Sequence, residues 1–161
     1  MFSRIENLPP TLVAGISKKI KLVGPEITGL WMSFMPRLKE ITNRSSSSIF
    51  SIQIYDPNIP IEKFDPITDL VIKWAAVPVT SSNNIPQGLQ THELRGGMYA
   101  VFIHRGLPAD FPGTMNYIFQ EWLPASGYLF DWREQFEVMG EKYKHNDPAS
   151  EEEVWIPIRQ A

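Results

Sequence analysis

The chain has 161 residues, of which 43% are hydrophobic, and a formal net charge of −3. This length favours one domain with one core over an enzyme domain joined to a DNA-binding domain. Lysine and arginine are scattered rather than clustered, which argues against direct binding of nucleic acid. The absence of cysteine excludes disulfides, thiolate nucleophiles and cysteine metal sites. The histidines show none of the close spacings of zinc sites, and we predict neither a metal nor a cofactor.

No segment predicts export or insertion into a membrane. The start of the chain carries charges where a signal peptide needs an apolar stretch, and no uninterrupted apolar run reaches membrane-spanning length. We therefore expect a cytoplasmic protein that has no membrane partner.

The first half of the chain predicts a strand, a helix and two further strands. A short apolar run within residues 10–20 predicts the first strand. Gly24-Pro25-Glu26 then opens a helix, because proline suits the first turn and an acid there meets the positive helix end. Pro36 lies inside the helical pattern and predicts a kink or a break. Strands at 49–55 and 69–77 follow. The apolar face of the helix consists of Ile27, Leu30, Trp31, Phe34, Leu38 and Ile41.

The second half predicts the same order of elements. Residues 89–104 are expected to form one long strand, with a bend or bulge at Gly96-Gly97. A second helix begins near Pro112 and ends at 124–127, and strands at about 132–139 and 153–158 complete this half. The acidic run Glu151-Glu152-Glu153 is expected to be a solvated turn before the last strand and not a metal site.

The two halves also match in sequence. Ile52-Gln53-Ile54 aligns with Phe136-Glu137-Val138, and the two helices align with identical spacing. We therefore predict an α+β fold made from a duplicated β-α-β-β unit with pseudo-two-fold symmetry. One domain would span 1–161, with copy one at about 5–79 and copy two at about 88–159. The two copies would pair edge to edge in one antiparallel sheet that carries two main helices, with a ligand cleft between the copies.

Four segments carry a family resemblance: 121–128 (EWLPASGY), 136–138 (FEV), 146–148 (NDP) and 154–158 (VWIPI). Together they resemble the GyrI-like small-molecule-binding domain, which is also the effector-binding module of AraC-type and BmrR-type transcription regulators. The resemblance implies a cleft glutamate, in the third strand of copy two, that holds lipophilic cations. Glu137 occupies that position, while Met139 replaces a tyrosine that the family often has two residues later. The chain leaves no room for a helix-turn-helix domain and so resembles the stand-alone members.

Elementary electrostatics agrees with a cation site at Glu137. A carboxylate in an apolar pocket is costly unless it is paired, and a bound cation supplies the partner. Each aromatic face adds about 0.5–2 kcal/mol of attraction for the same charge. Aromatic residues on the helices can equally belong to the core. The predicted ligand-binding residues are Glu137, Tyr99, Trp122, Trp31, Phe34, Tyr55 and Trp74.

Three functions remain open at this point. We favour the binding or sensing of an amphipathic, cationic small molecule. The first alternative is hydrolysis, since the resemblance extends to hydrolases of reactive cyclopropane-bearing compounds, in which Glu137 would act as general acid or base. An enzyme is less expected, because the sequence offers no nucleophile, metal set or catalytic dyad. The second alternative is a protein partner, either DNA gyrase or a separate regulator, contacted through acidic surface.

Overall fold

The computed structural model describes all 161 residues of the chain. They form one antiparallel sheet with helices packed on it. The strands are β1 Phe2–Leu8, β2 Thr11–Ile20, β3 Ile49–Ile54, β4 Val71–Pro78, β5 Gln90–Leu94, β6 Gly97–Arg105, β7 Tyr128–Phe130, β8 Gln135–Met139 and β9 Glu151–Gln160. The helical segments are α1 Pro25–Phe34, η1 Met35–Glu40, η2 Ile61–Lys63, η3 Pro108–Asp110, α2 Phe111–Tyr117, η4 Ile118–Trp122 and α3 Leu123–Ser126. The predicted α+β class with two main helices is confirmed.

The order of the strands shows the duplication directly. The sheet runs β1-β6-β9-β8-β3-β4-β2-β5, so that β3-β4-β2 of copy one corresponds to β8-β9-β6 of copy two. The copies meet where β3 pairs with β8, with Ile52 opposite Phe136 and Ser51 opposite Glu137. The predicted edge-to-edge pairing is therefore present, and its centre lies beside Glu137.

The outermost strands are exchanged between the copies. β1, at the start of copy one, pairs with β6, and β5, at the start of copy two, pairs with β2. The irregularity predicted at Gly96-Gly97 is present, with φ angles of +78° and +113°, but it separates two strands, β5 and β6, so the prediction of one strand over 89–104 is wrong. A Cβ on Gly96 would lie 2.5 Å from the carbonyl oxygen of Leu8, so only glycine fits this break. The short strand β7 and the N-terminal β1 were not predicted.

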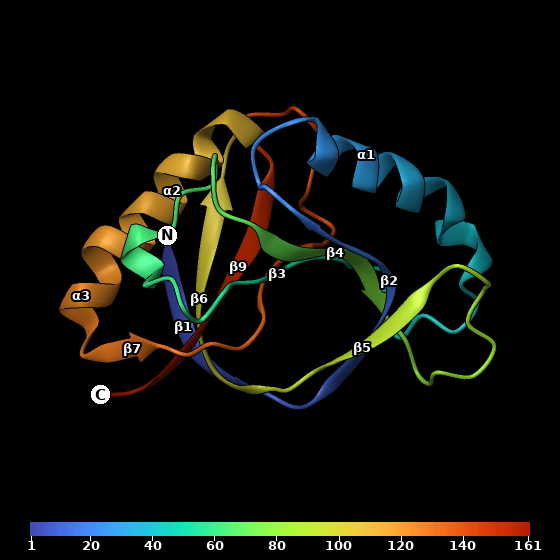
Figure 1. The fold of residues 1–161 in the computed structure, drawn as a ribbon, viewed down its shortest axis with the longest axis horizontal. Helices are drawn as coiled ribbons and strands as arrows, with labels where there is room; N and C mark the ends of the chain where they lie inside the picture. Colours follow the sequence, from blue (N-terminus) through green and yellow to red (C-terminus); the bar gives the residue numbers. More distant parts are fainter.

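Both helical segments change form along their length. α1 passes into the 3-10 helix η1 at Met35, next to Pro36, which confirms the predicted break. The second segment contains a turn of π-helix, η4, between α2 and α3, and it ends at Gly127 with φ +82°. Figure 1 shows α1 on one side of the molecule and α2 with α3 on the other. No helix has both the length and the hydrophobicity needed to cross a bilayer.

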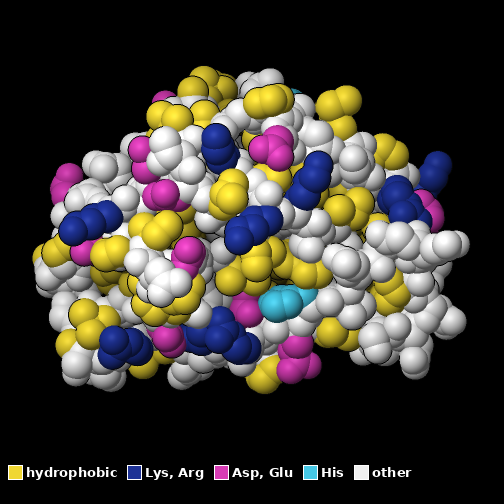
Figure 2. Space-filling model, in the orientation of Figure 1, with side chains coloured by type: hydrophobic (Ala, Val, Ile, Leu, Met, Phe, Trp, Pro, Cys, Tyr) yellow, Lys and Arg dark blue, Asp and Glu magenta, His cyan; other side chains and the backbone are white.

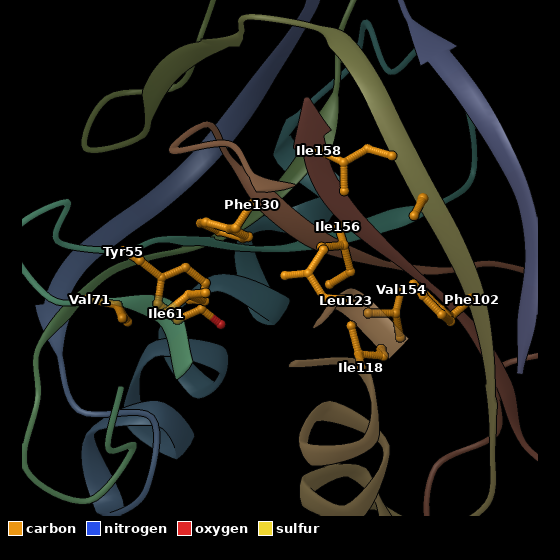
Figure 3. Close-up of a cluster of buried hydrophobic side chains, with 11 residues drawn as sticks. Tyr55, Ile61, Val71, Phe102, Ile118, Leu123, Phe130, Val154, Ile156 and Ile158 are labelled. Atoms are coloured by element: carbon orange, nitrogen blue, oxygen red, sulfur yellow. The ribbon is translucent and has the colours of Figure 1, made fainter. Parts of the chain in front are cut away.

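Apolar residues are buried on both faces of the sheet. On the face that carries the helices, called here the helix face, Leu30 and Phe34 of α1 join one cluster, and Ile118 of η4 and Leu123 of α3 join another. Figure 3 shows part of the second cluster, with Tyr55 beside Ile61. The opposite face holds a third cluster of Val13, Phe50, Ile52, Trp74, Ala76, Leu94, Tyr99, Val101, Phe136 and Trp155.

Candidate ligand-binding site

Five polar side chains interrupt the apolar helix face at the junction of the two copies. Side chains alternate along each strand, so the residues next to the apolar Ile52, Phe136 and Trp74 point to the helix face. All five are buried, and such groups need partners inside the protein. They are Ser51 and Gln53 of β3, Lys73 of β4, and Gln135 and Glu137 of β8.

The two oxygens of the Glu137 carboxylate have different surroundings. Oε2 accepts hydrogen bonds from the side-chain amides of Gln53, at 2.9 Å, and of Gln135. Oε1 accepts no hydrogen bond from the protein. Oε1 also remains accessible to solvent, because the only solvent-inaccessible side-chain polar atom that lacks a hydrogen-bond partner is Nε of Arg44. Glu137 is thus only 5% exposed, yet one of its oxygens has no hydrogen-bond partner in the protein.

A buried lysine lies on the other side of Gln53. Lys73 is 3% exposed, and its Nζ donates to Oγ of Ser51 at 2.5 Å and to Oε1 of Gln53. Because Gln53 in turn donates to Glu137, its amide lies between the positive and the negative group. Burial lowers the pKa of Lys73, and the negative charges of Glu137 and Glu152 oppose this change.

A second acid belongs to this site, and the sequence interpretation of it was wrong. Glu151, Glu152 and Glu153 lie inside β9 and do not form a turn before it. Glu152 is two residues from Val154, which pairs with Glu137, so both acids point to the helix face. Burial raises the pKa of Glu152 to about 7, with a further contribution from Glu137 that Lys73 opposes. Its neighbours Glu151 and Glu153 point away.

Aromatic rings adjoin the polar network through Tyr55. The Tyr55 hydroxyl donates to Oε1 of Gln135 at 3.1 Å. Its ring centroid lies 4.8 Å from that of Phe64, 6.0 Å from that of Phe130 and 6.5 Å from that of Phe119. Phe119 and Phe130 also line a surface hollow of about 480 Å³. Tyr55 therefore contacts walls of this hollow on one side and the Glu137 network on the other.

The structure brings one of the six predicted aromatic residues, Tyr55, to Glu137. Tyr99 and Trp74 lie in the cluster on the opposite face of the sheet, where Tyr99 donates to the carbonyl oxygen of Glu134 at 2.7 Å. The reason is strand alternation, because Trp74 directly follows Lys73 and must point the other way.

The three predicted helical aromatics lie toward the two ends of the helix face. Trp122 packs against Phe102, with ring centroids 5.0 Å apart, and Trp31 packs against Phe34 at 6.4 Å. The site residues that sequence reasoning missed are Ser51, Gln53, Lys73, Gln135, Glu152, Phe64, Phe119 and Phe130. The alternation of 135–139 could have indicated Gln135, but the others depend on which strands become neighbours.

The fold and the duplicated sheet are those of a class of small-molecule-binding domains. The chain belongs to the GyrI-like family, since residues 1–159 match the GyrI-like small molecule binding domain. It is similar to the transcriptional regulator BrlR of Pseudomonas aeruginosa, with 25% identity over 160 residues, which cover 98% of this chain and 56% of BrlR. The chain therefore spans about half the length of this curated relative.

Solved structures share the fold at low sequence identity. SAV2435 bound to tetraphenylphosphonium has a TM-score of 0.70 and 17% identity, covering 99% of this chain and 94% of that one. The C-terminal domain of EcmrR has a TM-score of 0.72 and 13% identity, covering 98% and 97%. Figure 2 shows basic and acidic side chains interspersed on the visible face, without the continuous basic patch typical of a nucleic-acid surface.

Proposed function

We propose that this domain binds an amphipathic, cationic small molecule on the helix face between α1 and the α2–α3 segment, with Glu137 as its counter-charge. The observation that carries this proposal is the unequal partnering of the carboxylate. Two amides hold Oε2, while Oε1 has no partner from the protein. A cation placed at Oε1 would complete the site without displacing a hydrogen bond.

The energetics favours a cation over a neutral ligand. Glu137 is already desolvated in the folded protein, so its attraction for a cation is screened less than that of a surface acid. The amides beside it are neutral, and they fix its position without cancelling its charge. A ligand carrying a positive group would therefore recover part of the cost of burying this acid.

The apolar part of the ligand would lie against the rings around Tyr55. Phe64, Phe119 and Phe130 surround this ring, and the adjoining hollow of about 480 Å³ falls within the range of roughly 300–1,000 Å³ common for ligand pockets. Stacking and charge attraction demand little fixed geometry, which suits a sensor of chemically varied compounds. The tetraphenylphosphonium bound to SAV2435 is a compound of this kind.

Fluorescence titration with tetraphenylphosphonium tests the proposal, and Trp132 in the wall of the hollow provides a reporter. We expect saturable quenching by the wild-type protein and affinity weakened roughly tenfold or more in Glu137→Gln, because one buried charge is lost. Glu151→Gln is the matched control. It removes one negative charge of the same kind from the opposite face of β9, where Glu151 forms an ion pair with Arg105. Triphenylphosphine oxide serves as a neutral analogue.

Equal affinity of the wild-type protein and Glu137→Gln would contradict the proposal, as would equal affinity for the phosphonium and the neutral oxide. The hydrolase and protein-partner alternatives stay predictions, because no contact in the structure bears on either. Both can be examined with the same variant, by turnover of cyclopropane-bearing electrophiles and by retention of gyrase subunits.

A further inference from the structure

Two buried charged groups, Lys73 and Glu137, and the half-buried Glu152 face one another on the helix face at the junction of the copies. Lys73 reaches Glu137 through Gln53, and Glu152 lies on the same face of β9 as Val154, the residue that pairs with Glu137. Buried charges cost several kcal/mol each unless opposite charges compensate them. One lysine can compensate one acid, so two ionised acids leave an excess of one negative charge.

The two copies differ at the positions of two of these charges. Lys73 lies opposite Gln53, and the corresponding pair in copy two is Val154 opposite Glu137. Two residues earlier, copy one has Val71 where copy two has Glu152. Each copy thus places a charge where the other has valine. Both charges face the same central glutamate.

Few other titratable groups face Glu152. His104 of β6 pairs with it across the sheet, and its ring contacts Thr114 at 2.7 Å. Tyr143 precedes β9 and is influenced by Glu152. Lys18 of β2 lies opposite Lys73 in the sheet and is exposed to solvent. The excess charge of the interior therefore depends on Lys73, Glu137 and Glu152.

We propose that Lys73 and Glu152 set the charge of the accepted ligand, so that the site selects compounds with one positive charge. This inference rests on the proposed function. With both acids ionised, a monocation brings the interior to neutrality, whereas a dication leaves an uncompensated positive charge. Because the pKa of Glu152 is raised to about 7, the excess negative charge is present above neutral pH and diminishes below it.

The test compares tetraphenylphosphonium with a bis-phosphonium dication of the same aryl groups, between pH 6 and pH 8. The proteins are the wild type, Lys73→Met, Glu152→Gln and the control Glu151→Gln. At pH 8 we expect Glu152→Gln to weaken binding of the monocation roughly tenfold and Lys73→Met to strengthen it roughly tenfold, the size of one charge at partial burial. Lys73→Met should also bind the dication better than the wild type does. The wild type should lose affinity toward pH 6, whereas Glu152→Gln should not.

The outcomes separate this inference from the proposed function. If Glu137→Gln abolishes binding while Lys73→Met and Glu152→Gln bind like the wild type, the proposed function stands and the inference fails. If tetraphenylphosphonium binds to none of these proteins, both fail. Circular dichroism and thermal unfolding confirm that each variant is folded. Should Lys73→Met not fold, the pH profile of Glu152→Gln decides alone, and a profile parallel to that of the wild type would overturn the inference.

Discussion

Two buried glutamates, three positions apart in the chain, are held in opposite ways. Glu134, just before β8, is 2% exposed, and both of its oxygens have partners. Oε2 lies 2.9 Å from Nε2 of His92, and Oε1 accepts the backbone N–H of Arg95 at 3.2 Å. The Arg95 guanidinium also approaches, at 3.5 Å. Glu137 has neutral amides on one oxygen only, so both oxygens of Glu134 are held by the fold, whereas Oε1 of Glu137 has no partner in the protein.

The pKa of Glu134 agrees with this division. Burial by itself would raise it, but the hydrogen bonds from His92 and the backbone, with the charge of Arg95, lower the pKa of Glu134 to about 2. This acid is therefore ionised across the physiological range and binds β5 to the segment that precedes β8. Arg133 strengthens the same junction by donating to the carbonyl oxygens of Gly96, Met98 and Ile158.

The largest expected effect is on stability, from Glu134→Ala. Removing this acid costs about 3–5 kcal/mol, because two hydrogen bonds to a charged group are lost and each contributes about 1.5–3 kcal/mol. Urea unfolding followed by tryptophan fluorescence measures the loss. Glu137→Gln, which keeps an acceptor for the two amides, should change the free energy of unfolding by less than about 1 kcal/mol. Similar losses in both variants would remove the distinction between the two acids.

The next effect concerns the link between Lys73 and Glu137, which is mediated by Gln53. A double-mutant cycle of Lys73→Met and Glu137→Gln should give a coupling free energy of about 1–3 kcal/mol, with the double variant less destabilised than the sum of the single ones. Denaturant unfolding at pH 8 provides the four values. Additive losses would show that the amide insulates the two charges from each other.

The sequence predicted the strands that carry this site better than it predicted the residues that form it. The alignment of Gln53 with Glu137 put the two residues in equivalent strands of the two copies, and these strands, β3 and β8, pair with each other in the sheet. Periodicity also predicted that Glu137 points away from Phe136. It could not identify Lys73 or Glu152, because each meets Glu137 only after β4 and β9 take their places on either side of β3 and β8.

For a related reason the sequence could not show that Tyr99 and Trp74 lie on the face of the sheet opposite Glu137. The alternation of residues along a strand divides them between two faces. It does not show which of these faces lies on the same side of the sheet as the polar residues of the neighbouring strand. That choice follows from the register, which places Trp74 beside Ile52 and therefore within the opposite cluster. The acidic run at 151–153 was likewise taken as solvated, although alternation sends its middle residue inward.

The third effect is a loss of stability toward higher pH that Glu152 adds, whereas the lowered pKa of Glu134 reduces stability only as the pH falls below about 4.3. The folded-state pKa of Glu152, about 7, lies above the ordinary value of about 4.3 for glutamate. Protonation is therefore easier in the folded state, and stability falls as the pH rises from about 4.3 to about 7. Glu152→Gln should raise the free energy of unfolding at pH 8 by roughly 1–2 kcal/mol and change it little at pH 4. Thermal unfolding at both pH values checks this, and an equal gain at both would exclude ionisation as its cause.

The smallest effect compares two buried tyrosines, one beside each acid. Tyr55→Phe removes the bond to Gln135, but Oε1 of Gln135 still accepts from Gln53 at 2.6 Å. Tyr99→Phe removes the bond to the carbonyl oxygen of Glu134 on the opposite face. Each should cost about 0.5–1.5 kcal/mol in urea unfolding. The two variants should differ in ligand binding, because only Tyr55 orients the amide that holds Glu137. Weaker binding of tetraphenylphosphonium by Tyr55→Phe, with Tyr99→Phe unchanged, would show that the helix face alone recognises the ligand, whereas equal weakening would place ligand affinity under the control of global stability.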